Sequence, residues 1–480
     1  MAKVGRTTEG ATPVELTADA IQAFETRFAG PVITPGDPAY DETRALWNGV
    51  IDKRPALIAQ CTGTADVVEA VALAREHDLP VAVRGGGHNV AGYASVDDGL
   101  VIDLSLMTGV LVDPVARTVL AQGGATLGHV DRETQLHGLA TPLGVVSATG
   151  VAGLTLNGGL GHLRRKYGLA CDNIVSVEIV TADGQVRTAT VDQNDDLFWA
   201  IRGGGGNFGI VTSFEFRLYE VGPELPSLFV WYHGDDAVDV LKAYREYTKT
   251  ASRDANTLAF TYAVPELAEF PKEAWGEPAV ILFGAYDGPE SDADAEFAPL
   301  KTLAAPIVDF SGTLPYVELQ RLLDEDYPDG LRYYWKSVYL DDLTDEIIDH
   351  IVHTHGESPS SLSTVDVWHL GGAIADRDAD ETAFAHRDAP YMVTYEANWE
   401  DAAMDDANVA WGRTGISDLR QLEGVAGAYG NFPGFDEAPG DLLFGENYER
   451  LVEIKTTYDP TNLFKLNQNI VPRGASQADD

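Results

Sequence analysis

The sequence is poor in cysteine: Cys61 and Cys171 are the only two in 480 residues. A disulfide framework is therefore excluded, and neither residue lies in a Cys-x-x-Cys pair of the kind that serves thiol redox chemistry or zinc. We also expect no metal site at His350, His353 and His355. They close a predicted helix before Gly356, where histidine suits the helix dipole, and no zinc motif surrounds them.

Positive charge is scarce as well. The chain carries 33 Lys and Arg against 75 Asp and Glu, a formal net charge of −42 at pH 7. Nucleic acids and anionic membranes are polyanions, so this balance argues against both as partners. The acidic residues are spread along the chain rather than gathered in one tail. This favours a salt-loving source, with an ordinary acidic protein as the alternative.

Long apolar runs are missing too. No stretch approaches the length that crosses a bilayer, and the first ten residues show neither a hydrophobic signal segment nor a twin-arginine. Hydrophobic residues still make up 45% of the chain, as in globular proteins, and 480 residues are too many for one ordinary core. We therefore expect a cytoplasmic protein with two domains and no membrane partner.

Glycine, by contrast, is plentiful, and its clusters carry the functional signal. An apolar run over 79–83 predicts a short buried strand that stops at Arg84-Gly85-Gly86-Gly87-His88-Asn89. Residues without a Cβ let the backbone turn sharply and approach a ligand, and successive amides can form an anion nest suited to a pyrophosphate. His88 follows the glycines, where its side chain would point at the bound group. One such loop by itself would indicate only a turn with a surface histidine.

Two further glycine clusters follow. The second, residues 149–161, mixes glycine with apolar residues and favours close backbone approach to a large flat ligand. The third, residues 203–209, fits Gly-x-Gly-x-x-Gly, but a helix is predicted before it and a strand after it. A nicotinamide fingerprint needs the opposite order, so a Rossmann domain is rejected. No Gly-Lys-Ser/Thr phosphate loop is present either.

Beyond Pro223 the pattern changes to alternating strands separated by helices. Aromatic strands are predicted at 332–336 and 391–395. In the latter, Tyr391, Val393 and Tyr395 share one face, while the residues between them share the other. This predicts a second domain, an antiparallel sheet with helices on one side. A helix is predicted over 446–457, and the closing segment 459–470 is expected to return to the first domain.

A set of short segments, in order along the chain, resembles a known family. They are Arg84-Gly-Gly-Gly-His-Asn, Thr149-Gly-Val-Ala-Gly, Asn157-Gly-Gly-Leu-Gly, Arg165-Lys-Tyr-Gly-Leu, Gly203-Gly-Gly-Gly-Asn-Phe-Gly, Tyr429-Gly-Asn and Asp459-Pro-Thr-Asn-Leu-Phe. Each is weak alone. The ordered set, over about residues 50–220 and 380–472, resembles the berberine bridge enzyme-like oxidases within the vanillyl-alcohol oxidase type of FAD flavoproteins.

The resemblance implies an α+β fold in two parts. It predicts an FAD-binding domain of vanillyl-alcohol oxidase type over 1–220, an inserted antiparallel-sheet substrate domain over 221–440, and a return to the first domain over 441–480. It also implies FAD bound covalently, from His88 to the flavin 8α-methyl group. The positions assigned to the cofactor are Arg84, Gly85, Gly86, Gly87, His88, Asn89, Gly92, Thr149, Gly150, Gly153, Leu154, Asn157, Gly158, Gly159, Gly161, His162, Asp172, Gly209, Ile210, Asn431 and Asn467.

Departures from the family pattern bear on the chemistry. The cysteine that forms a second flavin link in many relatives aligns with Val146, so we expect one link and none through sulfur. Phe432 replaces the second tyrosine of Tyr-x-Asn-Tyr, and the plant enzymes' catalytic glutamate aligns near Met392. A tyrosine that replaces these bases needs a lowered pKa. The remaining candidate bases are Tyr429, Tyr391 and Tyr395.

The sequence therefore predicts an FAD-dependent oxidoreductase that takes hydride from a small alcohol, sugar or related metabolite. Its electrons would pass to oxygen or another acceptor. Thr149 lies near the family's oxygen-access position and is small, which favours oxygen. Two alternatives stay open: a dehydrogenase that uses a quinone or dye, and a non-catalytic flavin-binding protein.

Overall fold

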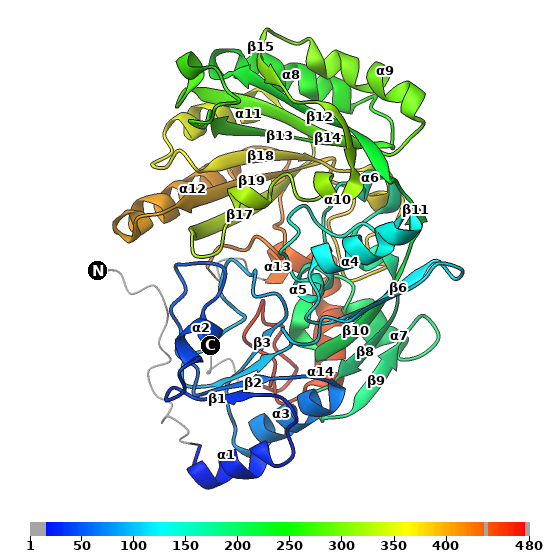
Figure 1. The fold of residues 1–480 in the computed structure, drawn as a ribbon, viewed down its shortest axis with the longest axis vertical. Helices are drawn as coiled ribbons and strands as arrows, with labels where there is room; N and C mark the ends of the chain where they lie inside the picture. The colour runs from blue at the N-terminus through cyan, green and yellow to red at the C-terminus, as the bar shows by residue number, and fades with distance from the viewer. Residues whose placement is uncertain (1–15, 436–439, 476–480) are drawn as a thin grey trace.

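The computed structural model describes residues 16–435 and 440–475. Residues 1–15 and 476–480 of the expected domains lie outside the described residues, as does the segment 436–439. The described chain forms two bodies stacked along its long axis (Figure 1). The lower body holds the N-terminal elements, and the upper body is built on one large sheet. No helix within the described ranges is long and apolar enough to cross a membrane.

The lower body contains two main sheets. The first has the order β1-β2-β4-β3 with β2, β4 and β3 parallel, and the second has the antiparallel order β5-β6-β10-β8-β9. Their strands are β1 (Val32–Ile33), β2 (Leu57–Gln60), β3 (Val81–Arg84), β4 (Leu100–Asp103), β5 (Val110–Asp113), β6 (Thr118–Gln122), β8 (Ile174–Val180), β9 (Val186–Ala189) and β10 (Ile210–Arg217). A short ladder pairs β7 (Leu139–Ala140) with β11 (Tyr219–Glu220).

Short helices connect and cover these strands. They are α1 (Ala18–Glu25), α2 (Tyr40–Arg44), α3 (Thr64–Glu76), α4 (Leu127–Thr134), α5 (Val151–Leu156), α6 (Arg164–Tyr167) and α7 (Asp195–Ala200). Helix α3 buries Val67, Ala70, Val71 and Ala74, the spacing of one apolar helix face. This face packs with residues of both sheets in one core, so α3 joins the two sheets.

The upper body is a nine-stranded sheet in the order β15-β12-β14-β13-β18-β19-β17-β20, with β16 paired to β12. The strands are β12 (Glu224–His233), β13 (Ala255–Ala263), β14 (Pro278–Tyr286), β15 (Pro306–Asp309), β16 (Gly312–Pro315), β17 (Arg332–Leu340), β18 (Thr364–His369), β19 (Tyr391–Trp399) and β20 (Val425–Ala426). Every pairing is antiparallel.

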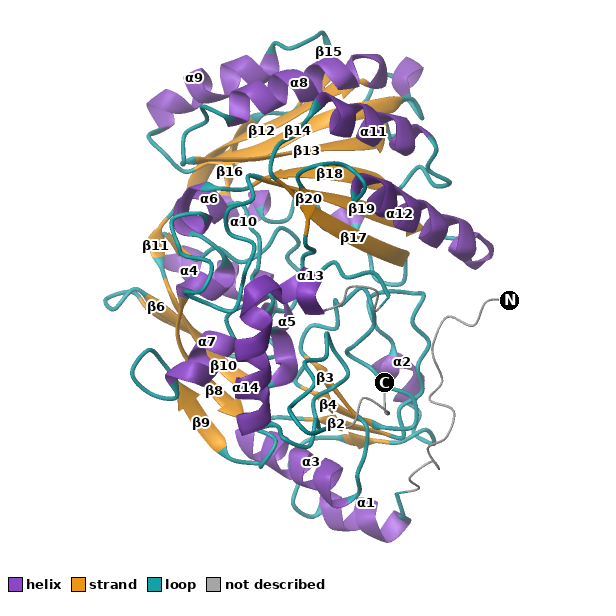
Figure 2. Cartoon of the chain, turned by 180° about the vertical axis from the view of Figure 1, so that it is seen from behind, coloured by secondary structure: helices purple, strands orange, loops and turns teal. Residues whose placement is uncertain are grey.

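Helices cover one face of this sheet and leave the other to the lower body. The covering helices are α8 (Ala237–Thr248), α9 (Glu290–Lys301), α11 (Asp345–Gly356) and α12 (Asp405–Leu419), whereas α10 (Tyr316–Leu319) lies on the side of the lower body. Figure 2 shows α8, α9 and α11 above the strands. The helix-side core contains Ile347, Ile351, Val393 and Tyr395.

The end of the chain returns to the lower body. After β20 the chain passes Tyr429 and forms α13 (Gly440–Phe444) and α14 (Tyr448–Tyr458). The fully buried Lys455 of α14 donates hydrogen bonds to Asp459 Oδ2 and to the carbonyls of Asn207 and Phe464. These bonds fasten the closing segment to the third glycine cluster.

Two buried arginines hold the bodies together. Arg164 and Arg165 lie on α6 of the lower body. Arg164 donates to the carbonyls of His369 at 3.0 Å and Thr257 at 2.5 Å, and Arg165 donates to that of Leu370 at 3.0 Å. Backbone carbonyls of the upper body thus replace the water that two buried, charged guanidinium groups have lost. These bonds connect the two bodies across their junction.

Candidate active site

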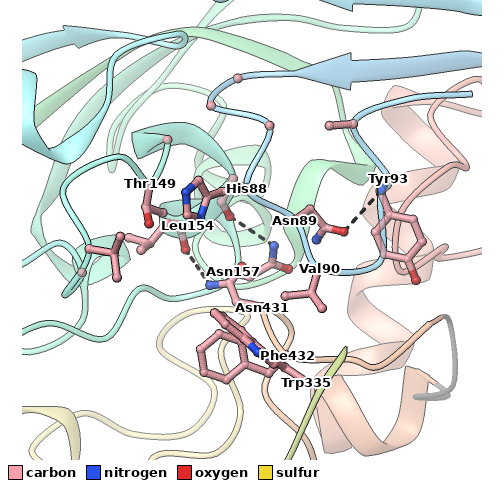
Figure 3. Close-up of a pocket in the computed structure, with 18 of the residues that line it drawn as sticks. His88, Asn89, Val90, Tyr93, Thr149, Leu154, Asn157, Trp335, Asn431 and Phe432 are labelled. Carbon is pink, nitrogen blue, oxygen red and sulfur yellow. Dashed lines mark hydrogen bonds between the residues drawn. The ribbon is translucent and has the colours of Figure 1, made fainter. Parts of the chain in front are cut away.

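A large cavity lies between the two bodies. Its first side, called here the glycine wall, is formed by residues 85–90 after β3, residues 144–160 around α5 and the start of β10. Its second side, called here the sheet wall, is formed by β13, β17, β18 and β19 together with residues 323–327. Figure 3 shows part of both walls, with His88 and Thr149 on the first and Trp335 on the second.

The glycine wall depends on a contact between two backbones. A Cβ built on Gly86 would lie 2.5 Å from both the Cα and the amide nitrogen of Gly150. No side chain fits there, so the first and second glycine clusters can meet only as glycine. Gly87 has φ +72°, a conformation that glycine adopts without strain. The glycines thus allow close backbone approach, and in the structure this approach is between the first and second glycine clusters.

Most residues assigned to the cofactor from the sequence line this cavity. Asn431 also donates from Nδ2 to the carbonyl of Leu154 at 3.1 Å, which joins the C-terminal return to α5 (Figure 3). The predicted residues that line the cavity are Gly85, Gly86, Gly87, His88, Asn89, Thr149, Gly150, Gly153, Leu154, Asn157, Gly209, Ile210, Asn431 and Asn467.

Asp172 and His162, both assigned to the cofactor, are buried away from the cavity lining. Asp172 is buried in a bidentate ion pair with Arg387, at 2.8 and 3.1 Å. His162 is buried at the junction of the two bodies, where its ring meets Phe283 of β14 edge to face at 5.2 Å. Burial lowers the pKa of His162 to about 3, so it stays neutral there. Both residues therefore pack in the structure around the cavity and do not line it.

The other predicted positions off the lining have packing roles. Arg84 donates from Nη1 to the carbonyl of Thr43, which anchors the strand end behind the glycine loop. A Cβ on Gly92 would clash with Ile51 at 2.7 Å. Each remaining glycine packs against neighbouring atoms of the protein. These glycines are Gly158, Gly159 and Gly161.

His88 is held by an aromatic stack. Its ring stacks on Trp47 at 4.3 Å between centroids, and Trp47 stacks in turn on Tyr333 of β17 at 3.7 Å. Burial lowers the pKa of His88 to about 4, which leaves the imidazole neutral near pH 7. Within the described chain, Nε2 of His88 is buried without a hydrogen-bond partner. The imidazole at the glycine wall is therefore uncharged, its ring is held by the stack, and one of its nitrogens lacks a hydrogen-bond partner.

Two of the three candidate bases are misplaced. Tyr391 and Tyr395 point to the helix side of β19, where their hydroxyls bond to Thr248 and Thr354. The prediction that Tyr391 or Tyr395 could serve as the base is wrong, because side chains alternate along a strand and this face belongs to the core under the helices.

Tyr429 does line the cavity, but its environment disfavours a base. Its hydroxyl oxygen accepts hydrogen bonds from the amide of Gly159 at 3.1 Å and from Nδ2 of Asn431 at 2.9 Å. Burial raises the pKa of Tyr429 well above its ordinary value. A base near neutrality needs the opposite shift, so the geometry gives Tyr429 a positioning role between α5 and the C-terminal return.

The sheet wall carries an acidic pair that sequence reasoning missed. Asp366 of β18 and Glu396 of β19 line the cavity and are 5% and 2% exposed. Tyr327 donates its hydroxyl to Glu396 Oε2 at 2.9 Å. Burial raises the pKa of both carboxyls, and the charge of Glu396 raises that of Asp366 further, so the pair retains a proton near neutrality. Groups with this property exchange protons with a substrate at physiological pH.

A signal for this pair was present in the alternation of β19. The face opposite Tyr391 and Tyr395 continues through Met392 and Thr394 to Glu396. The register pairs Thr364 with Glu396 and Asp366 with Thr394, so the two carboxyls lie on one face of neighbouring strands. Glu396 can be identified from the sequence by extending this alternation one step further. Asp366 can be identified only when the register between the two strands is known.

The residues present fit FAD. A Cβ on Gly153 or on Gly206 would meet no protein atom within 4 Å although both residues line the cavity, so space is kept for a ligand. Among the described residues, His88 Nε2 and Asn467 Oδ1 are buried polar atoms that lack a partner. Backbone amides of the glycine wall suit a pyrophosphate, and the apolar residues beside them suit a flat ring system.

Comparisons with known proteins agree with this fit. Residues 55–190 match the family model described as FAD binding domain, and residues 428–471 match that described as berberine and berberine like. An FAD-linked oxidoreductase of Dictyostelium discoideum is 32% identical over 459 residues, covering 94% of this chain and 97% of that protein. (R)-6-hydroxynicotine oxidase of Paenarthrobacter nicotinovorans is 31% identical, with 93% and 97% covered.

A solved structure extends the agreement to the fold. The crystal structure of 6-hydroxy-D-nicotine oxidase from Arthrobacter nicotinovorans matches with a TM-score of 0.83 and 29% identity, covering 92% of this chain and 98% of that one. The predicted α+β fold, flavin cofactor and oxidoreductase activity are thereby confirmed. The chain belongs to the berberine bridge enzyme-like family of FAD-linked oxidoreductases.

Proposed function

We propose that this enzyme oxidises a small metabolite at the sheet wall, with FAD held on the glycine wall through one covalent bond to His88. FAD, when bound, supplies the two-electron oxidation. The observation that carries the proposal is the pairing of the two walls in one cavity. A neutral, unsatisfied histidine lies on one wall, and two buried carboxyls with raised pKa values lie on the other.

The carboxyl pair is the proposed proton acceptor. Burial raises the pKa of Asp366 and Glu396, and either carboxyl, once ionised, can take a proton from a substrate. Tyr327 holds Glu396 in place through its hydroxyl. The tyrosines proposed from the sequence are replaced in this role. Two of them face the helix-side core, and the pKa of Tyr429 is raised rather than lowered.

The bond to the flavin is proposed to involve His88 and no sulfur. A neutral imidazole nitrogen is nucleophilic, and its stack on Trp47 fixes the ring. Val146, which aligns with the cysteine of relatives, lines the cavity and offers no thiol. Cys171 is fully buried off the cavity lining, and burial raises the pKa of its thiol, which keeps it protonated.

Acid precipitation tests the link. The precipitated protein should stay yellow, its mass should exceed the chain mass by one FAD, and the modified peptide should contain His88. His88→Ala should release its flavin on denaturation. Free FAD from the wild type would show that His88 is only a loop residue, and attachment at Cys171 would show that the alignment around Val146 is wrong.

A panel of alcohols, sugars and amines under anaerobic conditions tests the activity, with bleaching of the flavin absorbance as the readout. Re-oxidation by air and by a quinone then identifies the acceptor. We propose oxygen, because the small Thr149 lines the cavity. If no compound bleaches the flavin, the alternative of a non-catalytic flavin-binding protein is supported instead. If a quinone but not air restores the absorbance, the enzyme is a dehydrogenase.

A further inference from the structure

The sheet wall has an electrostatic character that selects a substrate class. Three acidic side chains line this part of the cavity: Asp326, Asp366 and Glu396. Among the described residues that line the cavity, no lysine or arginine is present to offset them. Aromatic side chains stand beside the acids, among them Tyr262 and Trp335. Carboxylates combined with aromatic rings form the usual recognition site for an organic cation.

One atom of the acidic pair is poised for a ligand. Asp366 is 5% exposed, and in the described chain its Oδ1 has no hydrogen-bond partner. A buried, unsatisfied carboxyl oxygen is costly, and a donor from a bound molecule removes that cost. Since Asp366 and Glu396 lie on one face of adjacent strands, one donor group with several protons can reach both.

Several other polar groups of this wall are already engaged, although Thr364 Oγ1 and Trp368 Nε1 are buried without a partner in the described chain. Asn398 accepts from Trp335 Nε1 at 2.7 Å and donates from Nδ2 to the carbonyl of Leu362 at 3.0 Å. The hydroxyls of Tyr327 and Thr394 donate to Glu396. A sugar, with its many hydroxyls, needs a mixture of available donors and acceptors. An anion would be repelled by the carboxyls. An ammonium group, which only donates and carries the opposite charge, matches the acceptor oxygens of these acids in a lining without lysine or arginine among the described residues.

We propose that the sheet wall takes a protonated amine, with its ammonium group at Asp366 and Glu396 and its apolar body against the aromatic rings. This inference rests on the proposed function of the cavity. Where a carboxyl of the pair is protonated, binding of the cation displaces that proton, which leaves to solvent. Oxidation requires the neutral amine, so the pair then accepts one N–H proton: the N–H bond breaks and a carboxyl O–H bond forms.

The test is a binding experiment on the oxidised holoenzyme with four probes: benzylamine, benzyl alcohol, benzoate and xylobiose. Isothermal calorimetry in two buffers of different ionisation enthalpy gives both the affinity and the number of protons released. We expect benzylamine to bind at least tenfold more tightly than benzyl alcohol, with proton release that falls as the pH rises and the pair ionises. Benzoate should be the weakest ligand.

Matched variants locate the effect. Asp366→Asn and Glu396→Gln should each weaken benzylamine at least tenfold and leave benzyl alcohol unchanged. Glu325→Gln removes the same charge from an exposed neighbour that does not line the cavity, and should leave both affinities unchanged. The comparison of benzylamine with benzyl alcohol uses only the wild type. It therefore tests the preference for a cation even if a variant fails to fold.

Two outcomes would overturn the inference. Benzyl alcohol or xylobiose binding as tightly as benzylamine would mean that the pair recognises hydroxyl groups. An unchanged benzylamine affinity in both cavity variants would place the cation elsewhere. Failure of the proposed function is distinguishable, because it would appear as protein purified without flavin or as flavin that no compound bleaches.

Discussion

The two walls of the cavity recognise their ligands by different means. The glycine wall contacts its ligand with backbone amide groups and offers space where side chains are missing. The contact between Gly86 and Gly150 lies at its centre. The sheet wall works through side chains that alternate along strands, with Asp366 and Glu396 at its centre. Backbone recognition requires particular residues at fixed positions, whereas side-chain recognition requires only that a strand presents the right face. The first wall therefore leaves a pattern that can be read in the sequence, whereas the second depends on which strand face points to the cavity.

The largest effect is expected at the backbone contact. Gly86→Ala places a Cβ 2.5 Å from the Gly150 backbone, so one cluster must move away from the other. We expect loss of bound FAD and a destabilisation of about 4 kcal/mol or more, because backbone cannot yield as a flexible side chain does. The FAD-to-protein absorbance ratio and urea denaturation measure this. Gly36→Ala is the control, since a Cβ there would meet no atom within 4 Å.

The separation of the walls should depend on Arg164. Arg164→Met keeps the apolar stem but leaves the carbonyls of His369 and Thr257 without their donor. We expect a loss of about 3–5 kcal/mol in the free energy of unfolding. Arg132→Met, at a side chain that is 78% exposed, should change it by less than about 0.5 kcal/mol. Equal effects in urea denaturation would mean that the bodies are held by other contacts.

The chemistry should be more sensitive on the sheet wall than at Tyr429. With a substrate that bleaches the flavin, Glu396→Gln should slow flavin reduction about a hundredfold or more, the usual range for a lost proton acceptor. Tyr429→Phe removes only a hydroxyl that accepts from Gly159 and Asn431, and should slow reduction about tenfold or less. Stopped-flow absorbance measures both rates. The reverse ranking would restore Tyr429 as the base.

The acidic pair should also make stability depend on pH. A carboxyl whose folded pKa is raised contributes most below its unfolded pKa near 4, and that contribution is lost as pH rises through the folded pKa. Wild-type stability should therefore decline from about pH 4 up to the raised folded pKa values, about 7 for Glu396, by up to about 1.4 kcal/mol per pH unit for each proton lost. Asp366→Asn should flatten this slope in urea titrations at several pH values. An unchanged slope would assign it to other groups.

The smallest effect concerns the outer surface that both bodies share. The dispersed net charge of −42 predicts repulsion that salt screens, so the melting temperature should rise by a few degrees between dilute buffer and molar potassium chloride. A flat or falling melting temperature would contradict the prediction of a salt-loving source.

Prediction from the sequence succeeded where local pattern determines structure. The structure contains the predicted strand that ends at Arg84. It also contains the predicted helix before the third glycine cluster and the predicted strand after it. Each of these elements can be predicted from residues that are close together in the chain. Prediction failed where a side chain's surroundings come from distant segments. His162 and Asp172 stand among residues assigned to the cofactor, yet their partners are Phe283 and Arg387, more than a hundred positions away.

The sequence by itself determined the position of the glycine wall, because close backbone approach excludes every residue except glycine and so leaves a readable pattern. The cofactor class came from the family resemblance that this ordered pattern carries. Only the tertiary structure decided which acids face the cavity. Strand register brings Asp366 beside Glu396, and helix packing turns Tyr391 and Tyr395 to the opposite face. The sequence of a strand shows which residues share a face but not which face points to the cavity. The layer that packs against each face decides which residues reach the substrate.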